Sequence, residues 1–409
     1  MTEELHNDQV LPIIKGRDII VISLSHWDTK IGSNARNLSL RFAKHNRVLY
    51  VNYPITRKTF MTSKPESETA IHCDIIRNKG EQMKEVGENL WVYYPDSIIE
   101  SVKWLPLTSM FKAANYINNR RYANDIKKAI SQLGFKDFII FNDMDIYNGF
   151  YLKELLKPSM YIYYFKDFLQ GFSYWKKHAT VMEPELIKKI DAVVCNSTYY
   201  TDYCLGLTPE SYYIGQGCDF SRFVKKEGRP VPEELQSLKG PVIGYVGVVY
   251  AERLDERIID VMAKANPGWN IVMVGPLDES FEKSHLQQYP NVHFLGWRSL
   301  DDLADYVEAF DVCINPQLVN HITRGNYPLK IDEYLAMGKP VVATRTKAMK
   351  LFEAYTYLAD APEEYPALIQ KAFDEHSPEK EKERMAFARK HTWENCVNEI
   401  YKVIEKSGK

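Results

Sequence analysis

The chain has 409 residues, of which 45% are hydrophobic and 26% are charged, and its formal net charge is −2. This length is enough for two or three domains with sizeable cores. The near-neutral charge excludes the broad basic field that a nucleic-acid-binding protein needs, so no nucleic-acid partner is expected. Six cysteines without a CxxC pair indicate buried free thiols in a reducing compartment, and a cytoplasmic location is expected.

The first half of the chain alternates between strand and helix patterns. The N-terminal stretch lacks the basic region and apolar core of a signal peptide, and no apolar run reaches the roughly 18 residues of a transmembrane helix. Buried strands are expected at 18–24, 48–51, 90–94, 137–141, 160–164 and 191–196, with helices from residue 34, within 101–133, at 183–190 and at 197–205. Residues 55–89 are poorly patterned and indicate a loop or a small excursion from the domain. The alternation predicts a Rossmann-like N-terminal domain over 1–220.

The loops that follow these strands carry the first candidate site residues, because ligands of such sheets bind at the carboxyl ends of the strands. His26 follows the first strand and is a candidate to orient an acceptor; the alternative is that it only structures the loop. Asp167 follows the strand at 160–164 and is a candidate base for an acceptor hydroxyl, or else a cap of the next turn. No GxGxxG motif is present, so no dinucleotide cofactor is expected.

Two further features of this half allow more than one interpretation. Asp143 and Asp145 form an Asp-x-Asp pattern, which we interpret as a strand-end loop that lines a cleft and not as a metal motif. Residues 101–133 form a basic amphipathic segment. Such a segment either packs on the core with a solvated basic face or lies on an anionic membrane, where it would suit a lipid-linked acceptor.

The strand–helix pattern restarts after a charged linker at 221–240. Strands are expected at 241–246, 270–275, 291–295, 311–315 and 340–344, which predicts a second Rossmann-like domain over 241–390. Gly244 and Gly247 would let the backbone approach a phosphate closely, and Arg253 is a candidate second cation. Trp297 either stacks on a nucleobase or anchors its own loop. A final helix over 391–409 ends the chain.

The most informative stretch is 326–344, NYPLKIDEYLAMGKPVVAT. It predicts a helix from Leu329 to Met337 that ends at Gly338. Lys330 and Glu333 lie three residues apart in this helix and therefore share one face. A helix N-terminus that carries a lysine is an anion site, and a glutamate one turn later is placed to accept bonds from sugar hydroxyls. The simpler alternative is an ordinary surface Lys–Glu pair.

The same stretch resembles the donor-binding segment of GT-B glycosyltransferases, which include family 4 and bacterial polysaccharide-biosynthesis enzymes. The resemblance implies two Rossmann-like domains facing across a cleft, with the last helix crossing back to the first domain. It also implies that Leu329, Lys330 and Glu333 bind the donor, with Lys330 on the diphosphate and Glu333 on the ribose. Gly32 and Ser33 resemble the N-terminal glycine loop near the donor phosphates or acceptor. The position of a second family glutamate is occupied here by Gly325.

These features predict a metal-independent hexosyltransferase without a cofactor. It would transfer a sugar from a nucleotide-diphosphate donor, with UDP as the expected nucleotide, to a glycan or lipid-linked acceptor in cell-surface polysaccharide biosynthesis. Asp167 would be the base of an inverting reaction and would only orient the acceptor in a retaining one. The alternatives are an epimerase of the same fold and a non-catalytic nucleotide-sugar-binding subunit.

Overall fold

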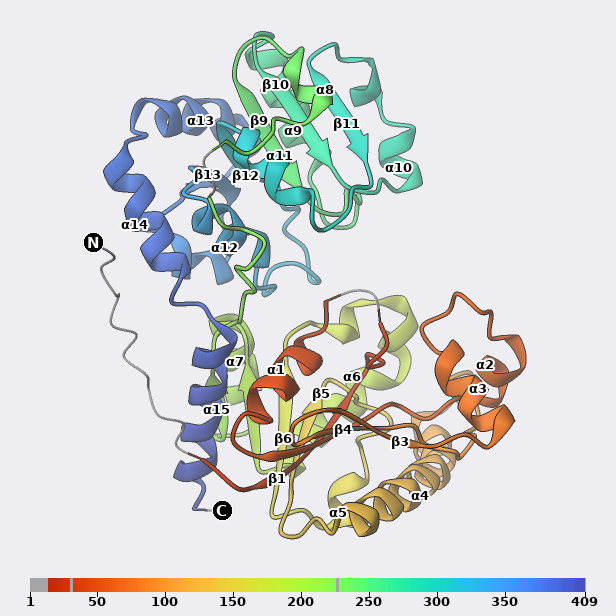
Figure 1. Cartoon of the computed structure of the whole chain (residues 1–409). Coiled ribbons are helices and arrows are strands. Elements are labelled where there is room, and N and C mark those ends of the chain that lie inside the picture. Colours follow the sequence, from red (N-terminus) through yellow and green to blue (C-terminus); the bar gives the residue numbers. More distant parts are fainter. Residues whose placement is uncertain (1–13, 30–31, 226–227, 409) are drawn as a thin grey trace. The chain divides into compact units, whose positions relative to one another are not determined.

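The computed structural model describes residues 14–29, 32–225 and 228–408, and these divide into two compact units (Figure 1). Unit 1 is the described part of Met1–Gly215 and of Trp393–Lys409. Unit 2 is the described part of Gln216–Thr392. Each unit has its own sheet and its own cores, so the two are treated one at a time.

Unit 1 is built on an eight-stranded sheet with the order β3-β4-β2-β1-β5-β6-β7-β8, in which only the β3–β4 pair is antiparallel. Its strands are β1 (Asp18–Ser23), β2 (Arg47–Val51), β3 (Met83–Gly87), β4 (Leu90–Tyr93), β5 (Ile139–Asp143), β6 (Met160–Phe165), β7 (Ala192–Cys195) and β8 (Ser211–Tyr213). Its helices are α1 (Asn34–Phe42), α2 (Arg57–Thr62), α3 (Ala70–Asn78), α4 (Thr108–Leu133), α5 (Leu152–Leu156), the 3-10 turn Leu169–Gly171, α6 (Ser173–Lys189), α7 (Thr198–Leu205) and α15 (Trp393–Lys406).

Helices cover both faces of this sheet, because side chains alternate along each buried strand. Ile20 and Ile22 of β1 belong to the core that includes residues of α4, α6 and α7. Ile19 and Val21 belong to the core that includes residues of α1 and α15. The last helix of the chain therefore packs on the sheet of the first unit, as Figure 1 shows for α15 beside α1.

Unit 2 has a six-stranded, all-parallel sheet with the order β11-β10-β9-β12-β13-β14. Its strands are β9 (Val242–Val246), β10 (Asn270–Val274), β11 (Val292–Gly296), β12 (Val312–Asn315), β13 (Val341–Thr344) and β14 (Tyr357–Ala359). Its helices are α8 (Glu233–Gln236), α9 (Glu256–Ala265), α10 (Glu279–Glu282), α11 (Leu303–Ala309), α12 (Leu329–Ala336), α13 (Tyr365–Asp374) and α14 (Pro378–Ala388), with 3-10 turns at His285–Gln288, Ala348–Phe352 and Pro362–Glu364. One core includes residues of α11 and α12, and the other includes residues of α9 and α13.

The predicted fold class is confirmed: two Rossmann-like units, each with a parallel-dominated sheet between helical layers. All six cysteines are buried and free, as expected. Among the described residues, no helix is both long enough and apolar enough to cross a membrane.

Several local predictions were wrong. Residues 55–89 contain α2, α3 and the antiparallel strand β3 instead of a plain loop. The helix expected at 183–190 begins ten residues earlier in the chain, at Ser173, and passes through Pro184. Proline removes one backbone bond from a helix. The helix continues through Pro184 because buried side chains lie on either side of the proline: Met182, Glu183, Leu186 and Ile187.

Candidate functional site

In unit 2, the strand order reverses between β9 and β12, and two predicted donor residues, Gly247 and Lys330, meet where β9 ends. Ligands of open parallel sheets bind outside the carboxyl ends of strands at such a switch point. Three neighbouring strands end here in glycines with positive φ: Gly247 (140°), Gly275 (146°) and Gly296 (69°). A Cβ on Gly275 would lie 1.9 Å from the carbonyl oxygen of Gly247. This edge of the sheet is therefore bare backbone, and Gly275 lies so close to Gly247 that it cannot carry a side chain.

Lys330 reaches this edge from α12. The helix spans Leu329–Ala336, and Gly338 ends it with φ of 74° while Lys339 N donates to Tyr334 O, as predicted for a glycine stop. The side chain of Lys330 crosses Gly247, and its ammonium lies 5.2 Å from the centroid of the Tyr245 ring. No described carboxylate forms an ion pair with Lys330. Its positive charge is therefore available to an anion near the start of α12.

Glu333 lies one turn further along α12, and its side chain is half-buried. Burial raises the pKa of its carboxyl to about 7, although the nearby charge of Lys330 acts in the opposite direction. In the part of the chain that the structure describes, no hydrogen bond is made to this carboxylate. A desolvated carboxylate with free lone pairs is suited to accept hydrogen bonds from hydroxyl groups.

The neighbouring Asp332 has a structural role that the sequence did not reveal. Its fully buried carboxylate accepts a 2.6 Å bond from the Tyr327 hydroxyl and makes a 2.6 Å contact with His391 Nδ1. Burial raises the pKa of Asp332, while the contact with His391 lowers it. These contacts fix α12 against the loop before it and against the segment before α15.

Three other predictions in unit 2 have different outcomes. A Cβ on Gly244 would lie 2.1 Å from the Phe310 ring, so Gly244 allows strand–helix packing and not phosphate approach, and that prediction was wrong. Trp297 is 70% exposed, and its loop is held by Arg298, which bonds Tyr306 and Glu234. Trp297 therefore does not anchor its own loop. Its stacking on a nucleobase stays a prediction. Arg253 is half-buried beside the loop of Leu318, and its role stays a prediction.

In unit 1, His26 is fully buried. Its ring packs against Tyr53 at 4.2 Å and His72 at 5.1 Å, and neither ring nitrogen has a hydrogen-bond partner among the described residues. Burial, and then the nearby His72, lowers the pKa of His26 to about 3, so the ring is neutral. Its catalytic role stays a prediction.

The remaining candidates of unit 1 lie in segments that follow strands: Gly32 and Ser33 directly before α1, and Asp167 after β6. Ser33 caps α1 and accepts from Arg36 N, while Gly32 is exposed with open space beside it. The preceding residues 30–31 of the glycine loop lie outside the described residues. Asp167 is half-buried and lies two residues after the end of β6. Its role as a base or as an acceptor ligand stays a prediction.

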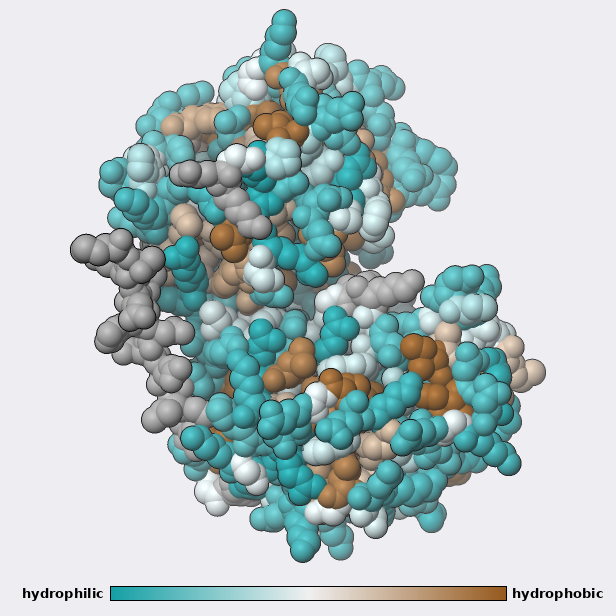
Figure 2. All heavy atoms as spheres, in the orientation of Figure 1, coloured by the Kyte–Doolittle hydropathy of each residue, from teal (hydrophilic) through white to brown (hydrophobic). Residues whose placement is uncertain are grey.

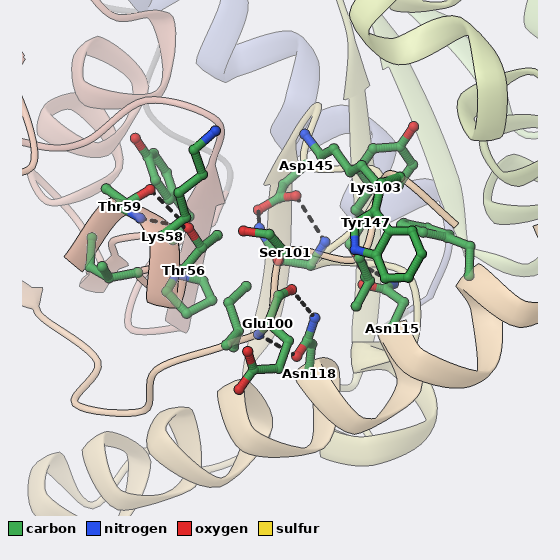
Figure 3. Close-up of a pocket in the computed structure, with 18 of the residues that line it drawn as sticks. Thr56, Lys58, Thr59, Glu100, Ser101, Lys103, Asn115, Asn118, Asp145 and Tyr147 are labelled. Carbon is green, nitrogen blue, oxygen red and sulfur yellow. Dashed lines mark hydrogen bonds between the residues drawn. The ribbon is translucent and has the colours of Figure 1, made fainter. Parts of the chain in front are cut away.

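Unit 1 also contains a pocket of about 700 Å³ that includes none of these candidates (Figure 3). It lies where β1 and β5 end, which is the switch point of this sheet. Its lining includes Tyr53, Lys58, Glu100, Lys103, Trp104, Phe111, Asn115, Asn118, Asp145, Tyr147, Asn148, Tyr174 and Trp175. The Asp-x-Asp pattern in the sequence indicated one residue of this pocket, Asp145. The other aspartate, Asp143, does not line the pocket and pairs with Lys166 at 2.6 Å. The aromatic residues carried no periodic signal.

The two sheets and their order define the GT-B fold, and solved structures of that fold superpose on nearly the whole chain. Sucrose-phosphate synthase from Thermosynechococcus elongatus has a TM-score of 0.66 at 15% identity and covers 95% of this chain and 99% of its own. HepE of Anabaena, solved in complex with UDP, has a TM-score of 0.66 at 15% identity and covers 95% of this chain and 100% of its own. At these identities the likeness concerns the fold.

Sequence comparison adds a family for the second unit. Residues 240–373 match the family described as glycosyl transferases group 1, and this segment contains α12 and Gly247. The chain is also similar to TuaH of Bacillus subtilis (strain 168), a protein provisionally assigned as a teichuronic acid biosynthesis glycosyltransferase. The two are 30% identical over 228 residues, which are 53% of this chain and 56% of that protein. The chain thus matches little more than half the length of this relative. The predicted resemblance to polysaccharide-type GT-B glycosyltransferases is confirmed.

Proposed function

We propose that the chain is a glycosyltransferase that moves a sugar from a UDP-sugar to a hydroxyl group of a glycan or lipid-linked acceptor in cell-surface polysaccharide biosynthesis. The observation that carries the proposal is the position of Lys330 across Gly247 at the beginning of α12. Two similar proteins support the choice of substrate: HepE was solved with UDP and with UDP-glucose, and TuaH is assigned to teichuronic acid biosynthesis.

The donor would be bound by groups of unit 2. The diphosphate would lie on the bare backbone beside Gly247, where the ammonium of Lys330 and the N-terminal end of the α12 dipole favour negative charge. Glu333 would accept hydrogen bonds from the ribose hydroxyls. Arg253 would supply a second cation, and Trp297 and Leu329 would contact the nucleoside. These are the roles that the sequence predicts for these residues.

The same groups would assist the chemical step. When the bond between the sugar and the diphosphate breaks, negative charge grows on the leaving phosphate oxygen. A lysine ammonium and helix N–H groups that are already oriented toward this oxygen stabilise the charge without reorganisation. Asp167 would accept the proton of the acceptor hydroxyl in an inverting reaction. In a retaining reaction it would only orient the acceptor.

The test is release of UDP from a panel of UDP-sugars in the presence of membrane extracts or oligosaccharides as acceptors. Wild-type protein should release UDP only when an acceptor is present, and Lys330→Ala and Glu333→Ala should each lose most of that rate. Turnover near the wild-type rate in both variants would refute the donor site. Conversion of the donor without an acceptor would favour an epimerase, and binding without any turnover would favour a non-catalytic subunit.

We also propose that the protein works in the cytoplasm on the inner face of the membrane, which it would contact through residues 101–133. Exposed apolar side chains in this segment support the proposal: Trp104 (73% exposed), Leu107 (59%), Met110 (47%) and Ile117 (56%). Several of its basic groups are already paired, as Lys112 is with Glu185 and Lys128 with Asp125. Apolar contact would therefore contribute more than charge. On the face visible in Figure 2, hydrophilic side chains predominate and apolar ones form separate groups.

A further inference from the structure

The pocket of unit 1 has the composition of a small-molecule site. Its volume of about 700 Å³ falls within the range of roughly 300–1,000 Å³ that is usual for ligand pockets. It is lined by residues of the segments after β1, β2, β4 and β5, of α2 and α4, and of the first turn of α6. Such pockets combine apolar and aromatic walls with a few polar groups that fix orientation.

Aromatic rings form one side of this pocket. Tyr147 and Trp175 lie 5.1 Å apart, and Tyr174 stands nearly perpendicular to Trp175 at 5.3 Å. Trp104 and Tyr174 are 73% and 68% exposed although both line the pocket. Large aromatic side chains that stay exposed beside a pocket have ring faces free to receive a ligand.

Lys103 is held among these rings by its ammonium group. Its Nζ lies 4.0 Å from the Tyr174 ring centroid, 4.1 Å from that of Trp175 and 5.1 Å from that of Tyr147. It donates one hydrogen bond, of 2.8 Å, to the Tyr174 hydroxyl. No described carboxylate forms an ion pair with Lys103. Because an ammonium has three N–H donors, Lys103 can still donate to a ligand.

Asp145 supplies the complementary acceptor. Its side chain is fully buried, yet it lines the pocket, and Figure 3 draws it beside Lys103. Its two oxygens accept from the backbone N and the side-chain amide of Asn148, at 3.0 and 2.9 Å. Burial raises the pKa of Asp145 to about 6. A carboxylate can accept about four hydrogen bonds, so acceptor positions remain for a ligand.

The aromatic rings, the hydrogen-bond acceptor Asp145 and the hydrogen-bond donor Lys103 together suit a saccharide ligand. A pyranose ring has a face of C–H bonds that packs on an aromatic ring, and a rim of hydroxyl groups that both donate and accept. Two carboxylates, of Asp145 and Glu100, and two ammonium groups, of Lys58 and Lys103, line the pocket. Because these charges balance, the pocket has no net positive charge to attract a polyphosphate such as the donor. Glu100 is already bound by Arg57 at 2.6 Å, which leaves Asp145 as the carboxylate for a hydroxyl.

We infer that this pocket is a saccharide-binding site for the acceptor. One sugar ring of the acceptor stacks on the exposed ring of Tyr174, and its hydroxyl groups bond to Asp145 and Lys103. The inference rests on the proposed function, since it assigns the acceptor of the same transfer. It names residues that are distinct from the predicted candidates His26, Gly32, Ser33 and Asp167.

The test is binding of the labelled protein to an immobilised array of neutral, N-acetylated and acidic mono- and disaccharides. We compare the wild type with Tyr174→Ala, with Asp145→Asn and with the control Tyr116→Ala. Tyr174 is largely exposed, so its loss should leave the fold intact. Tyr116 is a 41% exposed tyrosine of α4 that does not line the pocket. UDP binding by calorimetry on the same preparations reports on the donor site separately.

Wild-type protein should bind a defined subset of the saccharides. Tyr174→Ala and Asp145→Asn should each weaken that binding about tenfold or more, and Tyr116→Ala should leave it unchanged. All four proteins should bind UDP equally. Two results would overturn the inference: no saccharide bound by a protein that binds UDP, or binding that survives in both pocket variants. Loss of UDP binding alone would instead refute the donor site.

A second arm identifies the source of the sugar. Methyl and octyl glycosides of the bound saccharides are compared as competitors for the array. Tighter competition by the octyl compounds would indicate a lipid-linked acceptor, whose chain extends over the exposed Trp104. Equal competition would indicate a free glycan end, and both results support the saccharide site. Failure of both compounds to compete would overturn it.

Discussion

The side chain of Lys330 lies directly across the backbone of Gly247. A Cβ added to Gly247 would come within 3.2 Å of Lys330 Cε and 3.0 Å of the Tyr245 hydroxyl. Gly247 also has φ of 140°, which residues with side chains rarely adopt. A side chain at residue 247 would therefore make tight contacts with the ends of the Lys330 and Tyr245 side chains, which would have to shift by a few tenths of an ångström. The position of the Lys330 charge depends on this contact.

Replacing Gly247 with alanine should weaken UDP binding. The new methyl group would displace Lys330, and the positive φ would add strain of about 1–3 kcal/mol. We expect the Kd for UDP to rise about tenfold, which calorimetry would measure. Gly228→Ala is a matched control, because Gly228 has φ of 75° but no atom within 4 Å of the added Cβ. If both variants bind UDP like the wild type, the contact has no role in binding.

Glu333→Gln should weaken discrimination between ribose and deoxyribose. Wild-type protein is expected to bind UDP more tightly than 2′-deoxy-UDP or 3′-deoxy-UDP by about 1.5–3 kcal/mol, the usual contribution of a hydrogen bond to a charged group. The variant keeps only a neutral amide oxygen as acceptor, so its preference should fall to about 0.5–1.5 kcal/mol. Equal discrimination by both proteins would place the ribose contact elsewhere.

The ribose contact should also depend on pH. The raised pKa of Glu333, about 7, means that its carboxylate, the better acceptor, forms only as the pH rises through 7. The ratio of the Kd for the deoxy analogue to the Kd for UDP should therefore rise about severalfold in the wild type between pH 6 and pH 8. Glu333→Gln should show no such change. Because both ligands carry the same diphosphate, titration of the phosphate cancels in the ratio. A ratio that is independent of pH in the wild type would contradict this prediction.

Vesicle binding should depend on the exposed apolar residues before and within α4. Burial of a leucine or methionine side chain contributes roughly 1.5–3 kcal/mol, so Leu107→Ser with Met110→Ser should abolish most sedimentation with phosphatidylcholine–phosphatidylglycerol vesicles. Neither residue lines the pocket of unit 1. Val231→Ser is the control, because Val231 is 49% exposed in unit 2. Sedimentation of the double variant equal to the wild type would exclude this surface as the contact.

Unit 1 should lose stability in mild acid because of His26 and His72. Burial lowers their pKa values to about 3 and about 4 from an unfolded value of 6.5. Between these values the unfolded chain binds more protons, so stability present above pH 6.5 is lost as the pH falls toward 4. His26→Phe should reduce this fall in Tm between pH 7 and pH 5. An identical pH dependence in the variant would show that His26 does not contribute.

The sequence predicted the parts of the fold that local patterns determine. The strand and glycine stop around α12 were confirmed because an apolar run and a helix terminus are properties of neighbouring residues. The helix through Pro184 was not predicted, because its stability comes from burial against distant strands. Strand β3 was missed because its side chains are mostly exposed, which leaves no apolar pattern.

The two candidate sites also differ in how far the sequence could predict them. Lys330 and Glu333 lie in one helix, so their spacing alone placed them on one face. The pocket of unit 1 brings together Lys103, Asp145 and Tyr174 from three separate segments. Only the topology, with β1 and β5 adjacent at the switch point, brings these segments together. A sequence pattern could therefore indicate Asp145 at a strand end but not the aromatic residues beside it.

The most direct test of the donor site is calorimetric titration of UDP into the wild type, Lys330→Ala and the control Lys264→Ala. Lys264 is an exposed lysine of α9 that pairs with Asp260 away from α12. We predict that the wild type and the control bind UDP with the same Kd and that Lys330→Ala binds about tenfold or more weakly. Equal binding by Lys330→Ala and the wild type, or no binding by the wild type, would contradict the proposal that α12 holds the diphosphate of the donor.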